Sequence, residues 1–144
     1  MQELAYPLPP IKILFLEHNG EQHYKATVDE HAEVKWQGLS QVLKKGRGLW
    51  ALPPVKLELL RQTLEKYDFL NLDKPEPEGQ HPYSYTTTDL GSYTITVIFT
   101  DGRKKTILHD LGRQDMPKKL FQLERRLKTI LGIRKWAGPP MILE

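Results

Sequence analysis

Residues 92–110 most strongly constrain what this 144-residue chain can fold into. Residues 92–100 read SYTITVIFT, a run of β-branched and aromatic residues that favours a strand. The dipeptide Asp101-Gly102 follows, which is typical of a tight hairpin turn, and residues 103–110 return as the partner strand. The sequence therefore predicts an antiparallel hairpin in its second half.

A second set of strands is predicted in the first half of the chain. Residues 11–17 are rich in β-formers and end at His18-Asn19-Gly20, a turn signal. Residues 24–28 then alternate between apolar and polar side chains, as a half-buried strand does. Because each connection is short, we expect consecutive antiparallel strands.

The third strand is predicted to end at Gly38, with Val34 and Trp36 facing inward. Residues 41–50 are less clear, because Gly46 and Gly48 interrupt any long regular element.

Two amphipathic helices complete the pattern. Pro53-Pro54 favours a helix start, and residues 55–67 carry an apolar stripe formed by Val55, Leu59, Leu60, Thr63, Leu64 and Tyr67. The second helix is predicted to be capped by Asp115, with Pro117 in its first turn, and to stop at Gly132. Its apolar face comprises Met116, Leu120, Leu123, Leu127, Ile130 and Leu131.

The predicted fold is α+β, in the order β-β-β-α-β-β-α, with both helices on one face of an antiparallel sheet. It is built from two halves, each of which ends in a helix. We expect one domain over residues 1–144, with an extended, proline-rich lead-in at 1–10, a core over about 11–136 and an apolar tail at 137–144. The βαβ alternation and glycine-rich turn of nucleotide-binding α/β folds are not seen in the sequence.

The pattern resembles the bacterial family catalogued as domain of unknown function 6438. The resemblance rests on the strand end Val34-Lys35-Trp36-Gln37-Gly38, the helix at 57–67 leading into Phe69-Leu70, Thr88-Asp89-Leu90 before the long strand, Asp110, the last-helix residues Met116-Pro117, Leu120, Leu123-Glu124 and Leu127, and Trp136. It covers roughly residues 11–136 and supports the predicted order of elements, but it implies no activity.

The sequence departs from that resemblance between its first two strands. Many members of the family carry a two-cysteine turn there, whereas this chain has Glu17-His-Asn-Gly-Glu-Gln-His23 and retains only the glycine. Whatever those cysteines do in other members does not carry over.

Composition excludes several classes of protein. The chain has no cysteine, which rules out disulfides, thiolate metal sites, iron–sulfur clusters and a cysteine nucleophile. No apolar stretch approaches the length of a membrane span, and the N-terminus lacks the features of a secretory signal. We expect a cytoplasmic protein that carries no cofactor and has no membrane partner.

Histidines and acids cluster early in the chain and raise the question of a metal site; they are His18, Glu21, His23, Asp29, Glu30, His31 and Glu33. Imidazoles and carboxylates are metal ligands, but the spacing here matches no metal-binding motif. Polar residues at turns are usually solvated. We therefore predict no metal ligands.

A small set of polar residues could converge on a catalytic pocket. The candidates are Tyr85, Asp89 and His109, and Asp89 is notable because it precedes the strongest strand. An aspartate at a strand entrance commonly binds nearby backbone amides instead, which accounts for it without catalysis. No serine lies in a nucleophile-elbow motif. We favour a non-enzymatic protein and keep a low-turnover enzyme built on Tyr85, Asp89 and His109 as a third alternative.

Charge is uneven along the chain. Residues 101–136 hold eleven Lys and Arg against four Asp and Glu, a net charge of +7, and the rest of the chain has a net charge of −4. The candidate binding residues on the last hairpin and helix are Arg103, Lys104, Lys105, Lys118, Lys119, Phe121, Arg125 and Arg126. Glu124 interrupts this patch, and Lys128 is expected on its exposed arc.

Two functions follow from these patterns. The first is a binding or interaction module that meets a protein partner, or a second copy, through a sheet edge or the termini, where Tyr6-Pro-Leu-Pro-Pro10, Trp50 and the Met141-Ile-Leu tail look exposed. The alternative is a nucleic-acid-associated protein that uses the basic C-terminal hairpin and helix.

Overall fold

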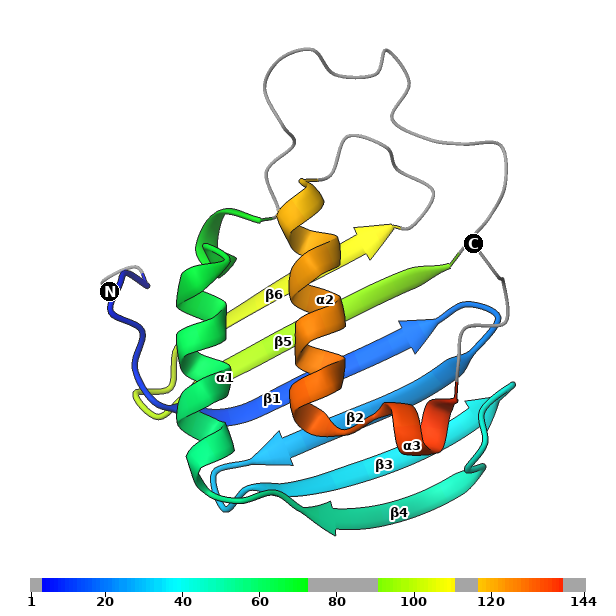
Figure 1. The fold of residues 1–144 in the computed structure, drawn as a ribbon. Coiled ribbons are helices and arrows are strands. Elements are labelled where there is room, and N and C mark those ends of the chain that lie inside the picture. The colour runs from blue at the N-terminus through cyan, green and yellow to red at the C-terminus, as the bar shows by residue number, and fades with distance from the viewer. Residues whose placement is uncertain (1–3, 73–90, 111–116, 139–144) are drawn as a thin grey trace, which may run out of the picture.

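The computed structural model describes residues 4–72, 91–110 and 117–138. Its centre is a six-stranded antiparallel sheet in the order β4-β3-β2-β1-β5-β6 (Figure 1). The strands are β1 (Ile11–Asn19), β2 (His23–Asp29), β3 (Glu33–Ser40), β4 (Gly46–Ala51), β5 (Ser92–Phe99) and β6 (Lys104–Asp110). β1 and β5 pair at the middle of the sheet, so the strands of the two halves join into one surface.

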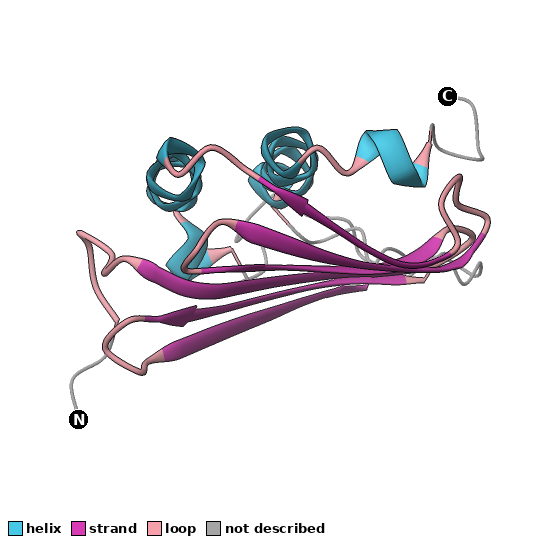
Figure 2. Cartoon of the chain, turned by 90° about the horizontal axis from the view of Figure 1, so that it is seen from below, coloured by secondary structure: helices cyan, strands magenta, loops and turns pink. Residues whose placement is uncertain are grey.

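The helices lie together on one face of this sheet, and no helix in the described part of the chain covers the other face (Figure 2). They are α1 (Val55–Lys66), α2 (Lys118–Leu131) and the short α3 (Arg134–Ala137), with a 3-10 turn, η1, at Phe69–Asn71. The α+β class and the placement of α1 and α2 on a single face are therefore confirmed.

The core lies between the sheet and the helices. Side chains at alternate positions of each strand point to the same face, and the buried positions of β1, β2 and β5 alternate in this way. Leu60 and Leu64 of α1 and Leu120, Leu123 and Leu127 of α2 cover them and are closed to solvent. This is the helical stripe that the sequence predicts, except that Val55 is 71% exposed.

The strand β4 lies in the segment 41–50 that the sequence left unclear, and it adds a fourth strand before α1 to the predicted order. Its backbone pairs with β3 from Gly46 opposite Gly38 to Ala51 opposite Glu33. Gly48 is required there by packing rather than by a turn, because a Cβ atom on it would lie 2.1 Å from the ring of Trp136. The tertiary contact therefore selects glycine within a strand.

Three tryptophans pack on one another above this end of the sheet. The ring centroids of Trp50 and Trp136 are 4.4 Å apart, and both rings contact Trp36. The indole N–H of Trp50 donates to the carbonyl of Leu131 at the end of α2. Trp50, predicted as an exposed contact residue, is instead half-buried within its own chain.

The N-terminal lead-in also packs on the chain itself. Leu8 is buried, its N–H donates to Glu65 Oε2 at 2.6 Å, and Arg61 donates to the Leu8 carbonyl. The hydroxyl of Tyr6 donates to Asp68 just beyond α1. The core thus begins before residue 11, and α1 covers this part of the segment predicted as a docking surface.

The ends of the helices agree with the sequence where they are described. α1 follows Pro54, and Gly132 ends α2 with a φ of +75°, which glycine adopts without strain. Asp115 and Met116 lie outside the described residues, as does the Met141-Ile-Leu tail. No helix in the described ranges is long and apolar enough to cross a membrane.

Candidate functional site

The strand register places four titratable side chains in one line across the sheet. His18 of β1 lies opposite Tyr24 of β2 on one side and Tyr93 of β5 on the other, and Tyr93 lies opposite His109 of β6. All four face the helices. We call His18, Tyr24, Tyr93 and His109 the polar row.

Members of the polar row contact one another directly. The rings of His18 and Tyr93 are stacked 4.3 Å apart, and the hydroxyls of Tyr24 and Tyr93 are 3.0 Å apart. Burial raises the pKa of both tyrosines, so both phenols are neutral near pH 7. Burial also lowers the pKa of His18 to about 4, with smaller contributions from Lys128 and His23. The row is therefore polar but uncharged at His18 and the two tyrosines.

The position of His18 corrects the sequence-based prediction of a turn. β1 runs two residues further than expected, to Asn19, so His18 becomes an inward-facing strand residue instead of a solvated one. The tight connection then falls at Gly20, between the strands. The error arose because the polar tripeptide His18-Asn19-Gly20 has the composition of a turn, although only its glycine lies outside the strand.

Glu124 of α2 meets the far end of the polar row. Its Oε2 lies 2.6 Å from Nδ1 of His109, and both side chains are closed to solvent. Burial raises the pKa of Glu124, while the hydrogen bond and charge of His109 oppose that shift. The prediction that Glu124 interrupts the basic surface is wrong, because the side chain is buried. It follows the apolar stripe and faces the sheet.

Lys128 connects the polar row to the basic surface above it. Its Nζ lies 5.6 Å from the ring centre of Tyr93, one helical turn beyond Glu124. Burial lowers its pKa, Glu124 opposes the shift, and Arg134 and Arg125 add to it. The lysine was expected on the exposed arc of the helix, but it is partly buried. It therefore shares its surroundings with two other cations.

A pocket of about 140 Å³ opens beside Lys128, between α2 and α3. We call it the basic pocket. Its lining includes three cationic side chains and no acidic residue among those described; the lining residues are Gln22, Arg125, Lys128, Thr129, Ile133, Arg134, Ala137 and Gly138. Gln22 is buried, and its amide donates to the carbonyl of Ala137 at 3.0 Å, which ties the β1–β2 turn to α3.

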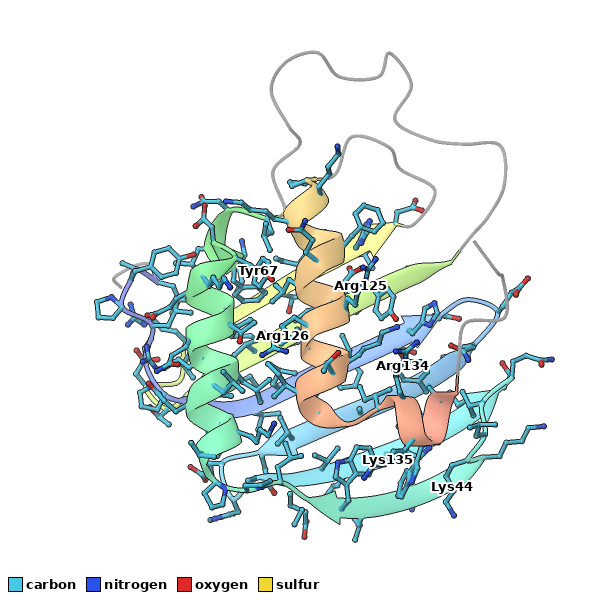
Figure 3. All side chains as sticks on the ribbon, in the orientation of Figure 1. Lys44, Tyr67, Arg125, Arg126, Arg134 and Lys135 are labelled. Atoms are coloured by element: carbon cyan, nitrogen blue, oxygen red, sulfur yellow. The ribbon has the colours of Figure 1, made fainter. Side chains whose placement is uncertain are left out.

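Figure 3 shows how neighbouring basic residues of α2 and α3 diverge. Arg125 and Arg134 lie on the side of α2 that faces α3, whereas Arg126 lies between α2 and α1. Lys135 is exposed and does not line the pocket. Adjacent residues in the sequence thus differ in their relation to the pocket.

The structure spreads the other predicted basic residues apart. Arg103 pairs with Asp101 in the β5–β6 turn. This turn lies near the N-terminal segment, where the backbone N–H of Thr100 donates to the carbonyl of Pro10 (Figure 1). Lys104 and Lys105 open β6 at that same end. Lys118 and Lys119 instead begin α2, which lies across the helix-covered face.

Phe121 packs edge-on against His109, with ring centroids 4.5 Å apart, and is 42% exposed. His109 is the only one of the three residues of the possible pocket that lies within the described residues. Tyr85 and Asp89 lie outside them, so the Tyr85–Asp89–His109 pocket stays a prediction.

The histidines and acids near the start of the chain make separate contacts and do not form one cluster within the described residues. His23 Nε2 lies 2.9 Å from Glu17 Oε2, and Asp29 accepts the N–H groups of His31 and Glu33. Nowhere in the described ranges do three or more His, Asp or Glu side chains gather as metal ligands would.

Several residues of the site were not found from the sequence. Helical spacing carried a signal for Glu124, because it lies four residues after Leu120 and four before Lys128. No local signal exists for Gln22 or Arg134, whose roles depend on how α3 folds back over the β1–β2 turn.

The comparisons with known proteins agree with the resemblance noted in the sequence. No curated protein matches the chain. The family described as "Domain of unknown function (DUF6438)" matches it over residues 22–131, which is more than half of its length. That span includes β2 to β6, both long helices and three members of the polar row. The chain therefore belongs to the DUF6438 family.

Proposed function

We propose that this protein is a non-enzymatic binding module whose ligand presents a small anionic group, such as a carboxylate or a phosphate, to the basic pocket. One observation carries the proposal: Arg125, Lys128 and Arg134 converge on a pocket whose described lining includes no acid. The charges of Arg125 and Arg134 lower the pKa of the partly buried Lys128, and a bound anion would relieve that repulsion.

The donor groups suit an oxyanion. A guanidinium presents a rigid fork of N–H donors that matches two oxygens of a carboxylate or phosphate. The pocket is lined by two guanidinium groups, those of Arg125 and Arg134. Within the described residues, neither Arg125 nor Arg134 is engaged in an ion pair, so their charges remain available to a ligand. A volume of about 140 Å³ accommodates one such group.

Binding is favoured over catalysis by the state of the polar row. Nδ1 of His109 is bonded to Glu124 Oε2, and both side chains are almost completely closed to solvent, so this pair serves to hold α2 on β6. The two tyrosines bond to each other, and their pKa values are raised away from the physiological range. These contacts support a structural role for the row beneath a binding pocket.

Two matched pairs of variants test the proposal. Inorganic phosphate and acetate are titrated into the protein, and binding is followed by calorimetry and by amide NMR shifts. We expect Arg125→Gln and Arg134→Gln each to weaken binding about tenfold, since each removes a charge-assisted hydrogen bond. Their sequence neighbours provide the controls: Arg126→Gln and Lys135→Gln remove the same charge outside the pocket, and affinity should change less than twofold.

The results separate a local site from a general effect of charge. Equal losses in all four variants would show that net charge, not the pocket, attracts the anion. Failure of the wild-type protein to bind either anion at low ionic strength would also overturn the proposal. Thermal unfolding of each variant confirms that the fold is retained before affinities are compared.

A further inference from the structure

The face of the sheet opposite the helices has a distinct composition. Strand register arranges its side chains in rows, one of which runs Leu49, Lys35, Thr27, Phe15, Thr96 and Thr106 from β4 to β6. The adjacent row runs Arg47, Gln37, Lys25, Glu17, Thr94 and Leu108. Helices cover only the other side of the sheet in the described part of the chain (Figure 2).

A broad concavity of about 660 Å³ lies on this face over β1 to β4. We call it the open-face groove. Its lining comprises Phe15, Lys25, Thr27, Lys35, Trp36, Gln37, Arg47, Gly48 and Leu49. Three of these residues are cationic and none is acidic, so the groove has a positive charge independent of the basic pocket on the opposite face.

Within the described residues no close ion pair engages the three cations of the groove, although the charge of Lys35 helps to lower the pKa of Asp29. Lys25 lies opposite Glu17 in the register, but the Glu17 carboxylate binds His23. Lys35 and Arg47 come from adjacent strands, so the cations follow one another across β2, β3 and β4. Such a line of separate positive charges complements a polyanion better than a single small anion.

The remaining side chains favour nucleic acid over an acidic polypeptide. Phe15 is partly exposed in the groove and offers a ring face on which a base can stack. Thr27 and Gln37 supply hydrogen-bonding groups between the cations. An acidic peptide would gain little from an aromatic ring. It could add as a strand only at the edge of β4, because the backbones of β1, β2 and β3 are already paired on both sides.

We propose that the open-face groove binds single-stranded nucleic acid, with phosphates on Lys25, Lys35 and Arg47 and a base on Phe15. This surface is separate from the basic pocket and lies on the opposite side of the sheet. It also differs from the surface predicted from the sequence, which comprised the last hairpin and helix.

The test measures fluorescence anisotropy of a labelled ten-nucleotide oligo(dT) or oligo(U) against protein at several salt concentrations. If three phosphates of a single strand are contacted, the logarithm of the association constant should fall with the logarithm of the salt concentration with a slope of about −2. The triple variant Lys25→Gln/Lys35→Gln/Arg47→Gln should bind at least tenfold more weakly, with a slope near zero. The matched control is Lys119→Gln/Arg126→Gln/Lys135→Gln, which removes three charges from the helix side and should change affinity less than threefold.

A second variant isolates the role of the aromatic ring. Phe15→Leu retains an apolar side chain but removes the stacking surface, and it should weaken oligonucleotide binding about fivefold or more. Phe15→Leu should leave the binding of inorganic phosphate unchanged, because Phe15 does not line the basic pocket, so the two proposals can fail independently. Circular dichroism and thermal unfolding establish that each variant is folded.

Three outcomes would overturn the proposal. The first is that the wild-type protein does not bind either oligonucleotide at low salt. The second is that the helix-side control loses as much affinity as the groove variant, which would assign binding to the last helix instead. The third is that a poly-glutamate peptide of equal charge binds as tightly and Phe15→Leu has no effect, which would identify an acidic polypeptide as the occupant.

Discussion

Glu124 and His109 join the last helix to the edge strand through a buried pair, with Oε2 of the glutamate 2.6 Å from Nδ1 of the histidine. Both residues are almost completely closed to solvent, although Glu124 lies on a helix whose outer side is basic. This contact joins α2 to β6 inside the core. Its removal is therefore the first test of the site's architecture.

We expect Glu124→Leu to destabilise the protein by about 1–3 kcal/mol, because Nδ1 of His109 would be left buried without its partner. Glu124→Gln keeps a side chain that can hydrogen-bond the imidazole and should cost less. Urea unfolding at pH 7 measures both. Equal losses for the two variants would mean that packing, not the hydrogen bond, holds the helix in place.

The buried His18 predicts a specific pH dependence of stability. Its pKa is lowered from 6.5 to about 4 in the folded state, mainly by desolvation. The unfolded chain therefore binds more protons between those values. Stability is full above pH 6.5 and falls as the pH is lowered towards 4. Allowing for partial exposure of the ring, we expect a loss of about 1 kcal/mol at pH 5.

The variant His18→Phe checks that prediction, because phenylalanine can still stack on Tyr93 but does not titrate. Urea unfolding is measured for both proteins at pH 7.5, 6, 5 and 4.5. The difference in stability between variant and wild type should shift in favour of the variant as the pH falls. A constant difference across that range would show that His18 does not contribute to the acid sensitivity.

Gly48 allows Trp136 to pack on the sheet. A methyl group there would meet the indole ring at 2.1 Å, so Gly48→Ala should displace the ring and cost about 1–3 kcal/mol. Near-UV circular dichroism and tryptophan fluorescence would report the altered cluster. In the background Trp136→Leu, the added cost of Gly48→Ala should shrink. A cost that is unchanged in that background would place the strain in the backbone of β4.

Leu8 tests whether the N-terminal segment belongs to the core. It is 3% exposed and lies beside α1, so Leu8→Ala should destabilise the protein by about 2–4 kcal/mol. The same substitution at Leu108, which is 64% exposed on β6, should cost less than about 1 kcal/mol. Chemical unfolding compares the two. Similar small losses would mean that the segment contributes little to stability.

Local sequence was enough for the elements that carry their own signal. The run of β-branched residues in β5 and the turn at Asp101-Gly102 need no distant partner to be recognised. The same is true of α2, whose stripe from Leu120 to Leu131 and terminating Gly132 define both its buried side and its end. β4 lacked such a signal, because its glycines are explained only by β3 and Trp136.

The sequence by itself determined the α+β class, the strand alternation, the two amphipathic helices and the excess of positive charge in the last third of the chain. Only the tertiary structure decided which polar residues meet. His18, Tyr93 and His109 are far apart in the sequence, and one register brings them into line. The same is true of Arg125 and Arg134, which share a pocket that the adjacent cations Arg126 and Lys135 do not line. Side-chain periodicity is a local property of the backbone, whereas register and helix docking depend on contacts between distant segments.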